Sequence, residues 1–208
     1  MKICLMSDTH GHALPDPGGA DLVIHAGDGT MGGSLVQVAS FSSSLYALGK
    51  PVIFVPGNHD VLFENKEIMA RDLLPINVTS LISEATRVGG LSLWGTPWTP
   101  WFNDWAFNNK NERNDNVYAG CPTGVDILIT HGPPYGILDT LTNGEHVGSR
   151  ELLAELDRIR PRIHVFGHIH SGYGRYYDNY TQFFNAAICN DAYQPVNPAF
   201  FVNIEEAR

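Results

Sequence analysis

The chain has 208 residues, of which 43% are hydrophobic and 17% charged, and its formal net charge at pH 7 is −9. This composition is typical of a globular protein that buries a core of its own, and it excludes a disordered chain. The acidic balance, without a basic cluster, excludes a general surface for long nucleic acids but not a local site for a small phosphorylated ligand.

The sequence predicts neither membrane insertion nor secretion. No apolar stretch is long enough to cross a bilayer. The N-terminal segment MKICLMSDTHG reaches Asp8 and His10 after a short apolar run and, unlike a signal peptide, has no small-residue cleavage site. Cys4, Cys121 and Cys189 are far apart and odd in number, which favours buried reduced thiols in a cytoplasmic protein.

In chain order, short apolar and β-branched runs alternate with segments of helical pattern. Five of the runs end in polar turns: residues 2–8, 21–28, 51–60, 126–134 and 162–170. Such runs predict strands buried on both faces, as in layered α/β proteins. Further strands are predicted over 91–96, 182–188 and 199–204.

Three helices are predicted between these strands, over residues 34–48, 63–73 and 149–159. Gly49 and Pro51 stop the first, and Ser149 is the expected N-cap of the third. The alternation predicts α/β layers with crossover helices. Residues 103–116, rich in asparagine, are the most loop-like insertion. With no linker or repeat, residues 1–208 are expected to form one domain.

Metal-competent side chains follow five of the predicted strands, where open α/β sheets build their sites. They are Asp8, His10, Asp28, Asn58, His59, His131, His168 and His170. Oxygen and imidazole donors suit manganese, iron, zinc and similar divalent ions. A lone histidine or Gly-Asp dipeptide at a strand end is more often a turn residue. Five strand ends that all supply such groups indicate one shared site.

The five blocks run in the order Asp-x-His, Gly-Asp, Gly-Asn-His-Asp, His and Gly-His-x-His. This order resembles the signature of the calcineurin-like metallophosphoesterase superfamily. The resemblance implies a four-layer α/β/β/α sandwich, with two mixed sheets packed face to face and helices outside. It also implies two divalent ions bridged by Asp28. By resemblance, Asp8, His10, Asp28 and His170 hold the first ion, and Asp28, Asn58, His131 and His168 hold the second.

The histidine pair in VFGHIHSGYG (165–174) follows a buried run and has glycines on both sides. Two histidines separated by one residue can serve neighbouring ions, which in two-metal sites lie roughly 3.5–4 Å apart. Glycines let the backbone turn sharply so that both rings reach inward. His168 and His170 are therefore interpreted as ligands.

The expected chemistry is hydrolysis. Two divalent ions bring four positive charges against the carboxylates of Asp8 and Asp28, so the site attracts a phosphate. A water bridging the ions would lose a proton near neutral pH and attack phosphorus in line with the leaving oxygen. By resemblance, His59 protonates that oxygen. Asp60 is expected to orient or bias the ring of His59, although an aspartate in a turn also has an ordinary capping role.

The second block, GDGTMGG (27–33), lacks the arginine of the Gly-Asp-x-Val-Asp-Arg-Gly block in phosphoprotein phosphatases of the superfamily. A guanidinium suits the extra charge of a monoester, so its absence favours phosphodiester cleavage, unless another arginine such as Arg175 takes that role. Four stretches are similar to the metallophosphoesterase-domain-containing branch: 94–108, 130–139, 145–152 and 164–174. The tail 185–201 also looks similar. The branch implies a phosphodiesterase that favours Mn, with iron, zinc, cobalt or nickel as alternatives.

The four tryptophans fall at a helical spacing, but two prolines among them disfavour a helix. Trp94 and Trp105 are interpreted as buried anchors of a loop. Trp98 and Trp101 are either such anchors or a wall on which a base stacks.

The other histidines first receive ordinary interpretations. His25 is a satisfied residue near the core, and His164 begins a strand. His12 lies in a glycine-flanked loop from which it could reach a substrate, and His146 is a candidate for lining the site.

Three alternatives to a phosphodiesterase stay open. A phosphomonoesterase, acting on small molecules or phosphoproteins, would cleave monoesters faster than diesters. A binding protein of this fold that has lost catalysis typically lacks ligands, whereas every ligand position is filled here. A nuclease would need a basic groove. The expected partner is a small phosphodiester or nucleotide, with neither a membrane nor a long nucleic acid, and the oligomeric state is not predicted.

Overall fold

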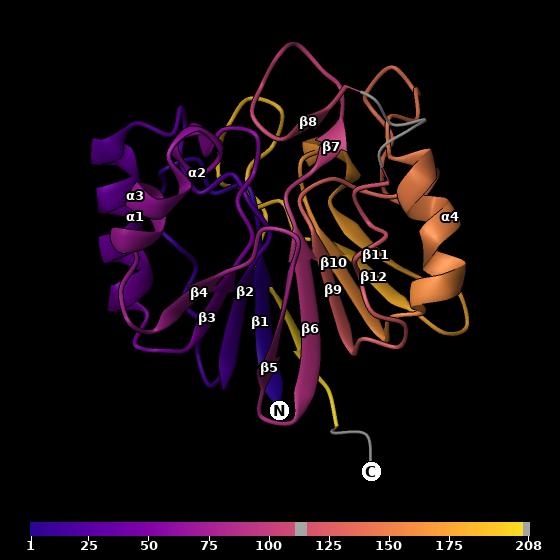
Figure 1. Ribbon diagram of the computed structural model, residues 1–208, viewed down its shortest axis with the longest axis horizontal. Helices are drawn as coiled ribbons and strands as arrows, with labels where there is room; N and C mark the ends of the chain where they lie inside the picture. Colours follow the sequence, from indigo (N-terminus) through magenta and orange to yellow (C-terminus); the bar gives the residue numbers. More distant parts are fainter. Residues whose placement is uncertain (111–115, 206–208) are drawn as a thin grey trace.

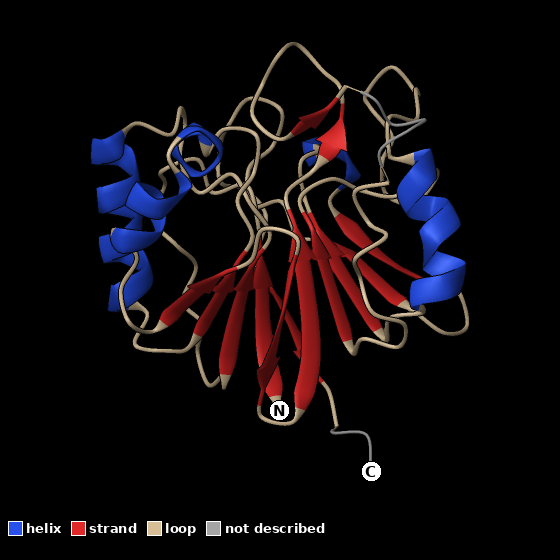
Figure 2. Cartoon of the chain, in the orientation of Figure 1, coloured by secondary structure: helices blue, strands red, loops and turns tan. Residues whose placement is uncertain are grey.

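A computed structural model describes residues 1–110 and 116–205 of the chain. Two large mixed sheets lie face to face between helices (Figures 1 and 2). This arrangement confirms the four-layer α/β/β/α sandwich expected from the sequence. Within the described ranges, no helix combines the length and the apolar character needed to cross a membrane.

The first sheet has the strand order β13-β1-β2-β3-β4. Its strands are β1 (Lys2–Met6), β2 (Leu22–His25), β3 (Val52–Phe54), β4 (Val78–Ser80) and β13 (Phe200–Asn203). β1 to β4 run parallel, and β13 is antiparallel to β1. β4 was not predicted from the sequence because its three residues, VTS, do not form an apolar run.

The second sheet has the strand order β11-β12-β10-β9-β6-β5. Its strands are β5 (Glu84–Val88), β6 (Leu91–Thr96), β9 (Ile127–Thr130), β10 (Ile163–Phe166), β11 (Gly174–Tyr177) and β12 (Gln182–Asn185). The four central strands run parallel, and β5 and β11 close the two edges antiparallel. These edge strands are mostly exposed, so their sequences lack the buried pattern by which the others were predicted.

The two longer helices begin at side-chain caps that the sequence carries. α1 (Leu35–Ala47) has a capping box between Ser34 and Gln37, and α4 (Arg150–Ile159) has the predicted N-cap Ser149, which accepts from the Leu152 N–H at 3.1 Å. The helix predicted over 63–73 is instead two short helices, α2 (Val61–Asn65) and α3 (Glu67–Asp72). Lys66 separates them because its φ of −147° lies outside the helical region.

Three apolar clusters hold the layers together. The cluster between the sheets takes residues from both, including Ile3, Ile24, Ile129 and Val165. A second cluster packs α1, α2 and α3 against the outer face of the first sheet, and a third packs α4 against the second sheet. Buried apolar surface therefore fixes how the two sheets face each other.

The parallel strands of both sheets end at one edge, the upper edge in Figure 1, where the two-residue strands β7 (Thr99–Pro100) and β8 (Asn108–Asn109) also lie. An isolated bridge between Ser7 and Ala187 joins the sheets there. β7 and β8 pair within the tryptophan-rich segment. Of the loop predicted over 103–116, residues 111–115 lie outside the described part of the chain.

Candidate metal centre

All eight side chains predicted to form one site lie at this edge. Asp8 and His10 follow β1, Asp28 follows β2, Asn58 and His59 follow β3, His131 follows β9, and His168 and His170 follow β10. Three groups have ligand atoms within 4.8 Å of one another: Asp8–His10–His170, His10–Asp28–His59 and Asp28–His131–His168. The two histidines of the last block fall into different groups, as their spacing suggested.

The carboxylate of Asp28 belongs to two of these three groups. Its Oδ1 accepts from the backbone N–H of His59 at 2.8 Å. Its Oδ2 lies 3.4 Å from Nε2 of His131, 3.9 Å from Nε2 of His10 and 4.0 Å from Nε2 of His59. One carboxylate is thus shared by imidazoles from both sheets.

Asp8 is the second buried carboxylate. Both of its oxygens accept from the backbone N–H of His168 at 3.0 Å, and Oδ1 lies 3.3 Å from Nε2 of His170. Burial alone would raise the pKa of Asp8, but the hydrogen bond and charge of His170 outweigh it and hold this pKa well below its usual range. Asp8 is therefore ionised at the edge of the sheets.

Backbone carbonyls fix which ring nitrogen three of the histidines turn toward the site. The Nδ1 atom of His59 lies 2.8 Å from the carbonyl oxygen of Met31. The Nδ1 atom of His131 lies 2.9 Å from that of Ala26, and the Nδ1 atom of His170 lies 2.9 Å from that of Asn190. A carbonyl oxygen only accepts, so each Nδ1 carries the hydrogen. In the neutral ring Nε2 then carries a lone pair, the form that binds metal.

The resulting lone pair of His131 faces an acceptor, and that of His170 faces a ring nitrogen of a second histidine. Nε2 of His131 lies 2.9 Å from Oδ1 of Asn58, and Nε2 of His170 lies 3.2 Å from Nε2 of His10. With neutral rings no hydrogen lies between His131 and Asn58, but a cation there would satisfy both atoms. Burial opposes protonation of His131, yet Asp28 raises its pKa to about 9. The donor set therefore attracts positive charge and fits divalent metal ions.

Four residues of the site have backbone conformations that side chains rarely adopt. The φ angles are +52° for Asp8, +45° for His10, +55° for Asp28 and +67° for His168. Left-handed conformations are uncommon outside glycine, and each has an energetic cost that the surrounding structure must offset. Their concentration at one edge marks it as a site rather than a set of ordinary turns.

Two glycines are required by close packing against the carboxylates. A Cβ on Gly57 would meet Oδ1 of Asp28, and a Cβ on Gly167 would meet Oδ2 of Asp8. Gly167 was predicted to provide a sharp turn, but the feature that requires glycine there is this contact, and its φ is not in the left-handed region.

The structure corrects the role expected of Asp60. Its buried carboxylate accepts from the backbone N–H of Gly29 at 3.2 Å, of Gly57 at 2.9 Å and of Thr30 at 3.0 Å, and from the Thr30 hydroxyl at 2.9 Å. Burial and the charge of Asp28 raise the pKa of Asp60 to about 6. Asp60 joins the loops after β2 and β3, whereas the carbonyl of Met31 orients the ring of His59.

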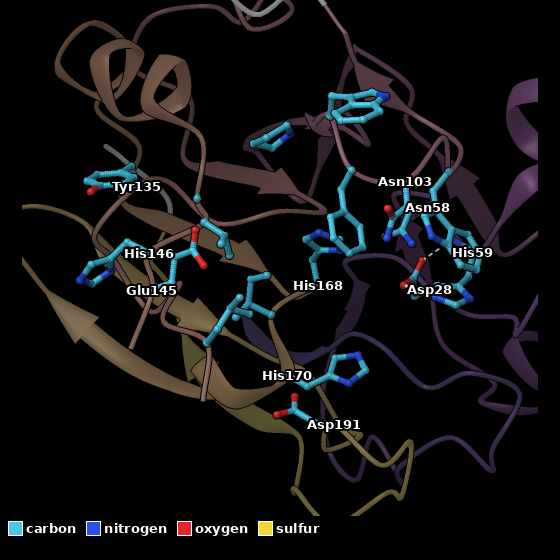
Figure 3. Close-up of a pocket in the computed structure, with 18 of the residues that line it drawn as sticks. Asp28, Asn58, His59, Asn103, Tyr135, Glu145, His146, His168, His170 and Asp191 are labelled. Carbon is cyan, nitrogen blue, oxygen red and sulfur yellow. Dashed lines mark hydrogen bonds and ion pairs between the residues drawn. The ribbon is translucent and has the colours of Figure 1, made fainter. Parts of the chain in front are cut away.

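A cavity of about 760 Å³ opens onto this edge (Figure 3). Asp28, Asn58, His59, His168 and His170 line one end of it. Tyr135, Glu145 and His146 line the other end, so His146 does line the site, as the sequence suggested.

The burial of the four tryptophans differs in part from the prediction. Trp94 is buried in the core, as expected. Trp105, expected to be buried, is 38% exposed, and its ring lies 4.3 Å from that of His59. Of the pair left open, Trp98 packs against Phe107, whereas Trp101 is 56% exposed and lines the cavity.

Tyr193 is a site residue that sequence reasoning missed. Its ring lies edge-on to those of His10 and His170, with centroids 4.8 and 5.5 Å away. Its carbonyl oxygen accepts from Nε2 of His12 at 2.9 Å, so His12 holds this segment rather than lining the cavity. Only the similarity of the tail to known proteins could have indicated Tyr193, because its surroundings have no strand or helix pattern.

Comparison with known proteins identifies the family and agrees with the fold. Residues 1–172 match the family model described as calcineurin-like phosphoesterase. The chain belongs to this family, which implies a phosphoester hydrolase that uses divalent metal ions.

Individual relatives extend this similarity over the whole chain. The human and mouse proteins named metallophosphoesterase domain-containing protein 1 are each 38% identical over 236 residues, covering 100% of this chain and 72% of theirs. The UPF0046 protein T07D4.2 of Caenorhabditis elegans is 35% identical, covering 82% of this chain and 51% of its own. The crystal structure of TT1561 of Thermus thermophilus is similar in fold, with a TM-score of 0.66, 16% identity and 88% of each chain covered.

Proposed function

We propose that the protein is a dinuclear metal-dependent phosphodiesterase that prefers manganese. Asp8, His10, Asp28 and His170 would hold one ion, and Asp28, Asn58, His131 and His168 the other. The observation that carries this proposal is that His131 and His170 have Nδ1 tied to backbone carbonyls, so that Nε2 of each faces a buried carboxylate.

The charges of the site suit a phosphate ester. Two divalent ions, when bound, supply Lewis acidity that activates water and neutralises the phosphoryl oxygens. Asp8 and Asp28 offset only two of the four positive charges, so the loaded site attracts an anion although the whole chain is acidic.

His59 is the proposed proton donor to the leaving oxygen. Its Nδ1 donates to the Met31 carbonyl, so the ring exchanges its other proton through Nε2, which lies 4.0 Å from Asp28 Oδ2. His59 lines the cavity, and Trp105 packs against its ring, excluding water from that face. A protonated His59 can therefore deliver its proton to a group bound beside Asp28.

The arginines support diester over monoester cleavage. Arg175, the arginine named from the sequence as an alternative partner for a monoester, is exposed on β11 and does not line the cavity. Among the described residues, the arginine that lines the cavity is Arg150, which stacks on Tyr135. Tyr135 lies at the end of the cavity away from His59 (Figure 3). No described guanidinium is therefore placed to neutralise a monoester beside Asp28.

The cavity size and the charge of the chain define the remaining parts of the proposal. A volume of about 760 Å³ suits a small or nucleotide-like phosphodiester, and the net charge of −9 opposes long nucleic acids.

The three cysteines are buried and unpaired, which supports a cytoplasmic location. We also propose that residues 1–208 form one domain, because the cluster between the sheets includes residues from Ile3 to Ile204.

A paired rate assay tests the proposal. Purified protein is given bis(p-nitrophenyl) phosphate or p-nitrophenyl phosphate, with Mn and then with a chelator. Diester cleavage should require the metal and exceed monoester cleavage. Faster monoester cleavage would make the protein a phosphomonoesterase. No turnover of either ester by protein shown to hold metal would indicate a binding protein.

A further inference from the structure

We propose that the end of the cavity away from the metal centre binds a second anionic group, a phosphate or carboxylate carried on one arm of the diester. The inference rests on the proposed function for the placement of the reacting phosphate. It is supported by a group of side chains from the loop after β9 and from the first residue of α4, called here the distal cluster: Tyr135, Asp139, Glu145, His146 and Arg150.

Arg150 supplies the positive charge of the distal cluster. Its guanidinium carbon lies 3.5 Å from the centroid of the Tyr135 ring, a cation–π contact that fixes the plane of the guanidinium. No ion pair joins Arg150 to an acidic group in the parts of the chain that the structure describes. A guanidinium held by its face keeps its N–H edges for a ligand, and their geometry matches a phosphate or carboxylate.

His146 is held in place beside Tyr135 by a buried carboxylate. Its Nδ1 lies 2.6 Å from Oδ1 of Asp139, and its ring centroid lies 5.6 Å from that of Tyr135. Asp139 is fully buried and also accepts from the backbone N–H groups of Gly136 and Gly148 at 2.8 and 2.9 Å. The charge of Asp139 is thus used within the loop, and His146 keeps Nε2 for a ligand.

The arrangement favours recognition of charge over recognition of a base. Arg150 already covers a face of Tyr135, so a nucleobase cannot stack there. The trio of Trp101, Phe102 and Trp105 lines the cavity and provides aromatic surface elsewhere. Glu145 is the opposing charge of the distal cluster, since it lines the same end and would weaken anion binding (Figure 3). Arg150 and Glu145 should therefore have effects of opposite sign.

A matched pair of substrates isolates the second anion. Thymidine 5′-(p-nitrophenyl phosphate) and its 3′-phosphorylated form release the same p-nitrophenolate and differ by one phosphate. With Mn-loaded protein, KM should be about tenfold lower for the 3′-phosphorylated substrate, the effect expected of one charge-assisted hydrogen bond. Arg150→Gln should abolish most of this preference and Glu145→Gln should increase it. The matched control Arg175→Gln removes an exposed arginine outside the cavity and should keep the wild-type preference.

Direct binding separates this inference from the proposed function. Calorimetry on Mn-loaded protein compares thymidine 3′,5′-bisphosphate with thymidine 5′-monophosphate, in the wild type and in Arg150→Gln. Tighter bisphosphate binding that depends on Arg150 supports an anion site at the distal cluster, whether or not the diesters are cleaved. Failure to cleave either diester would refute the hydrolytic function and leave this inference standing. Equal affinities in the wild type, or an unchanged preference in Arg150→Gln, would overturn the inference.

Discussion

Two regions of the molecule bury histidines, and they use opposite ring nitrogens. At the strand-end edge, His59, His131 and His170 donate from Nδ1 to backbone carbonyls and turn Nε2 toward carboxylates. Within the sheet layers, His25 in β2 and His164 in β10 use Nε2 instead, at 2.9 Å from the hydroxyl oxygens of Thr9 and Thr130.

This difference separates two of the proposed ligands, His131 and His170, from the core histidines. The Thr130 hydroxyl lies 2.6 Å from the carbonyl oxygen of Gly132 and donates to it, so its oxygen accepts from His164. Both regions bury the rings, and burial alone therefore distinguishes nothing. His131 and His170 each have a backbone acceptor on Nδ1 and an acidic group facing Nε2, whereas Nε2 of His25 and His164 faces a hydroxyl. His25 and His164 match the ordinary interpretations given to them from the sequence.

The largest effect should come from removing the shared carboxylate. Asp28→Asn is expected to weaken both metal ions together and to lower kcat/KM by about a thousandfold or more, because it removes the carboxylate charge that both proposed ligand sets share. Metal content measured by elemental analysis, alongside diester turnover, checks this. Asp157→Asn changes an exposed carboxylate on α4 and serves as the control. Loss of one ion alone would contradict a bridging role.

Next in size is the loss of the proposed proton donor. His59→Ala should keep both metal ions but lower kcat by about a hundred- to ten-thousandfold, the usual contribution of a positioned acid. The loss should be smaller for a p-nitrophenolate leaving group, which needs little protonation, than for an alkoxide. Equal losses for both leaving groups would show that His59 acts by another route, such as positioning.

The backbone of the metal centre provides a third test. Gly57→Ala would force a Cβ against the Asp28 carboxylate and the His131 ring, so metal affinity should fall by about ten- to a hundredfold. Gly120→Ala adds a methyl group in open space and should change neither affinity nor stability measurably. Metal titration of both variants makes the comparison, and similar affinities would mean that the loop after β3 yields without disturbing Asp28.

The sequence could predict which side chains lie together at the strand-end edge because polar residues recur at the ends of apolar runs. Apolar runs such as KICLM and LVIH predicted buried strands, and the polar residues that follow them lie together in space. The edge strands β5 and β11 and the break at Lys66 were missed because they are set by exposure and by single backbone angles.

The partners that orient the ligands could not be predicted in the same way. Met31, Ala26 and Asn190 contribute carbonyl oxygens, which every residue has, so their identities carry no signal. Asp60 was assigned to the ring of its sequence neighbour, His59, but its carboxylate turns toward backbone N–H groups at Gly29 and Gly57. Contacts made by tertiary packing lie beyond what spacing along the chain can show.

The smallest effect should come from the sheet interior and should appear in stability rather than in turnover. Burial lowers the pKa of His164 from its ordinary 6.5 to about 3, so the folded protein keeps this ring neutral where the unfolded chain binds a proton. The free energy of unfolding therefore has its full value with respect to His164 above pH 6.5, and it decreases as the pH falls toward 3. Between pH 7 and pH 5 the loss is about 2 kcal/mol.

His164→Leu should remove this dependence, and urea unfolding at pH 7 and pH 5, with chelator present throughout, measures it. Protonation of the edge histidines is common to both proteins and cancels in the difference between them. The wild type should therefore lose about 2 kcal/mol more than His164→Leu on going to pH 5. An equal loss in the two proteins would mean that His164 gains its proton within the folded state, and the contrast between the two regions would then rest on the edge histidines alone.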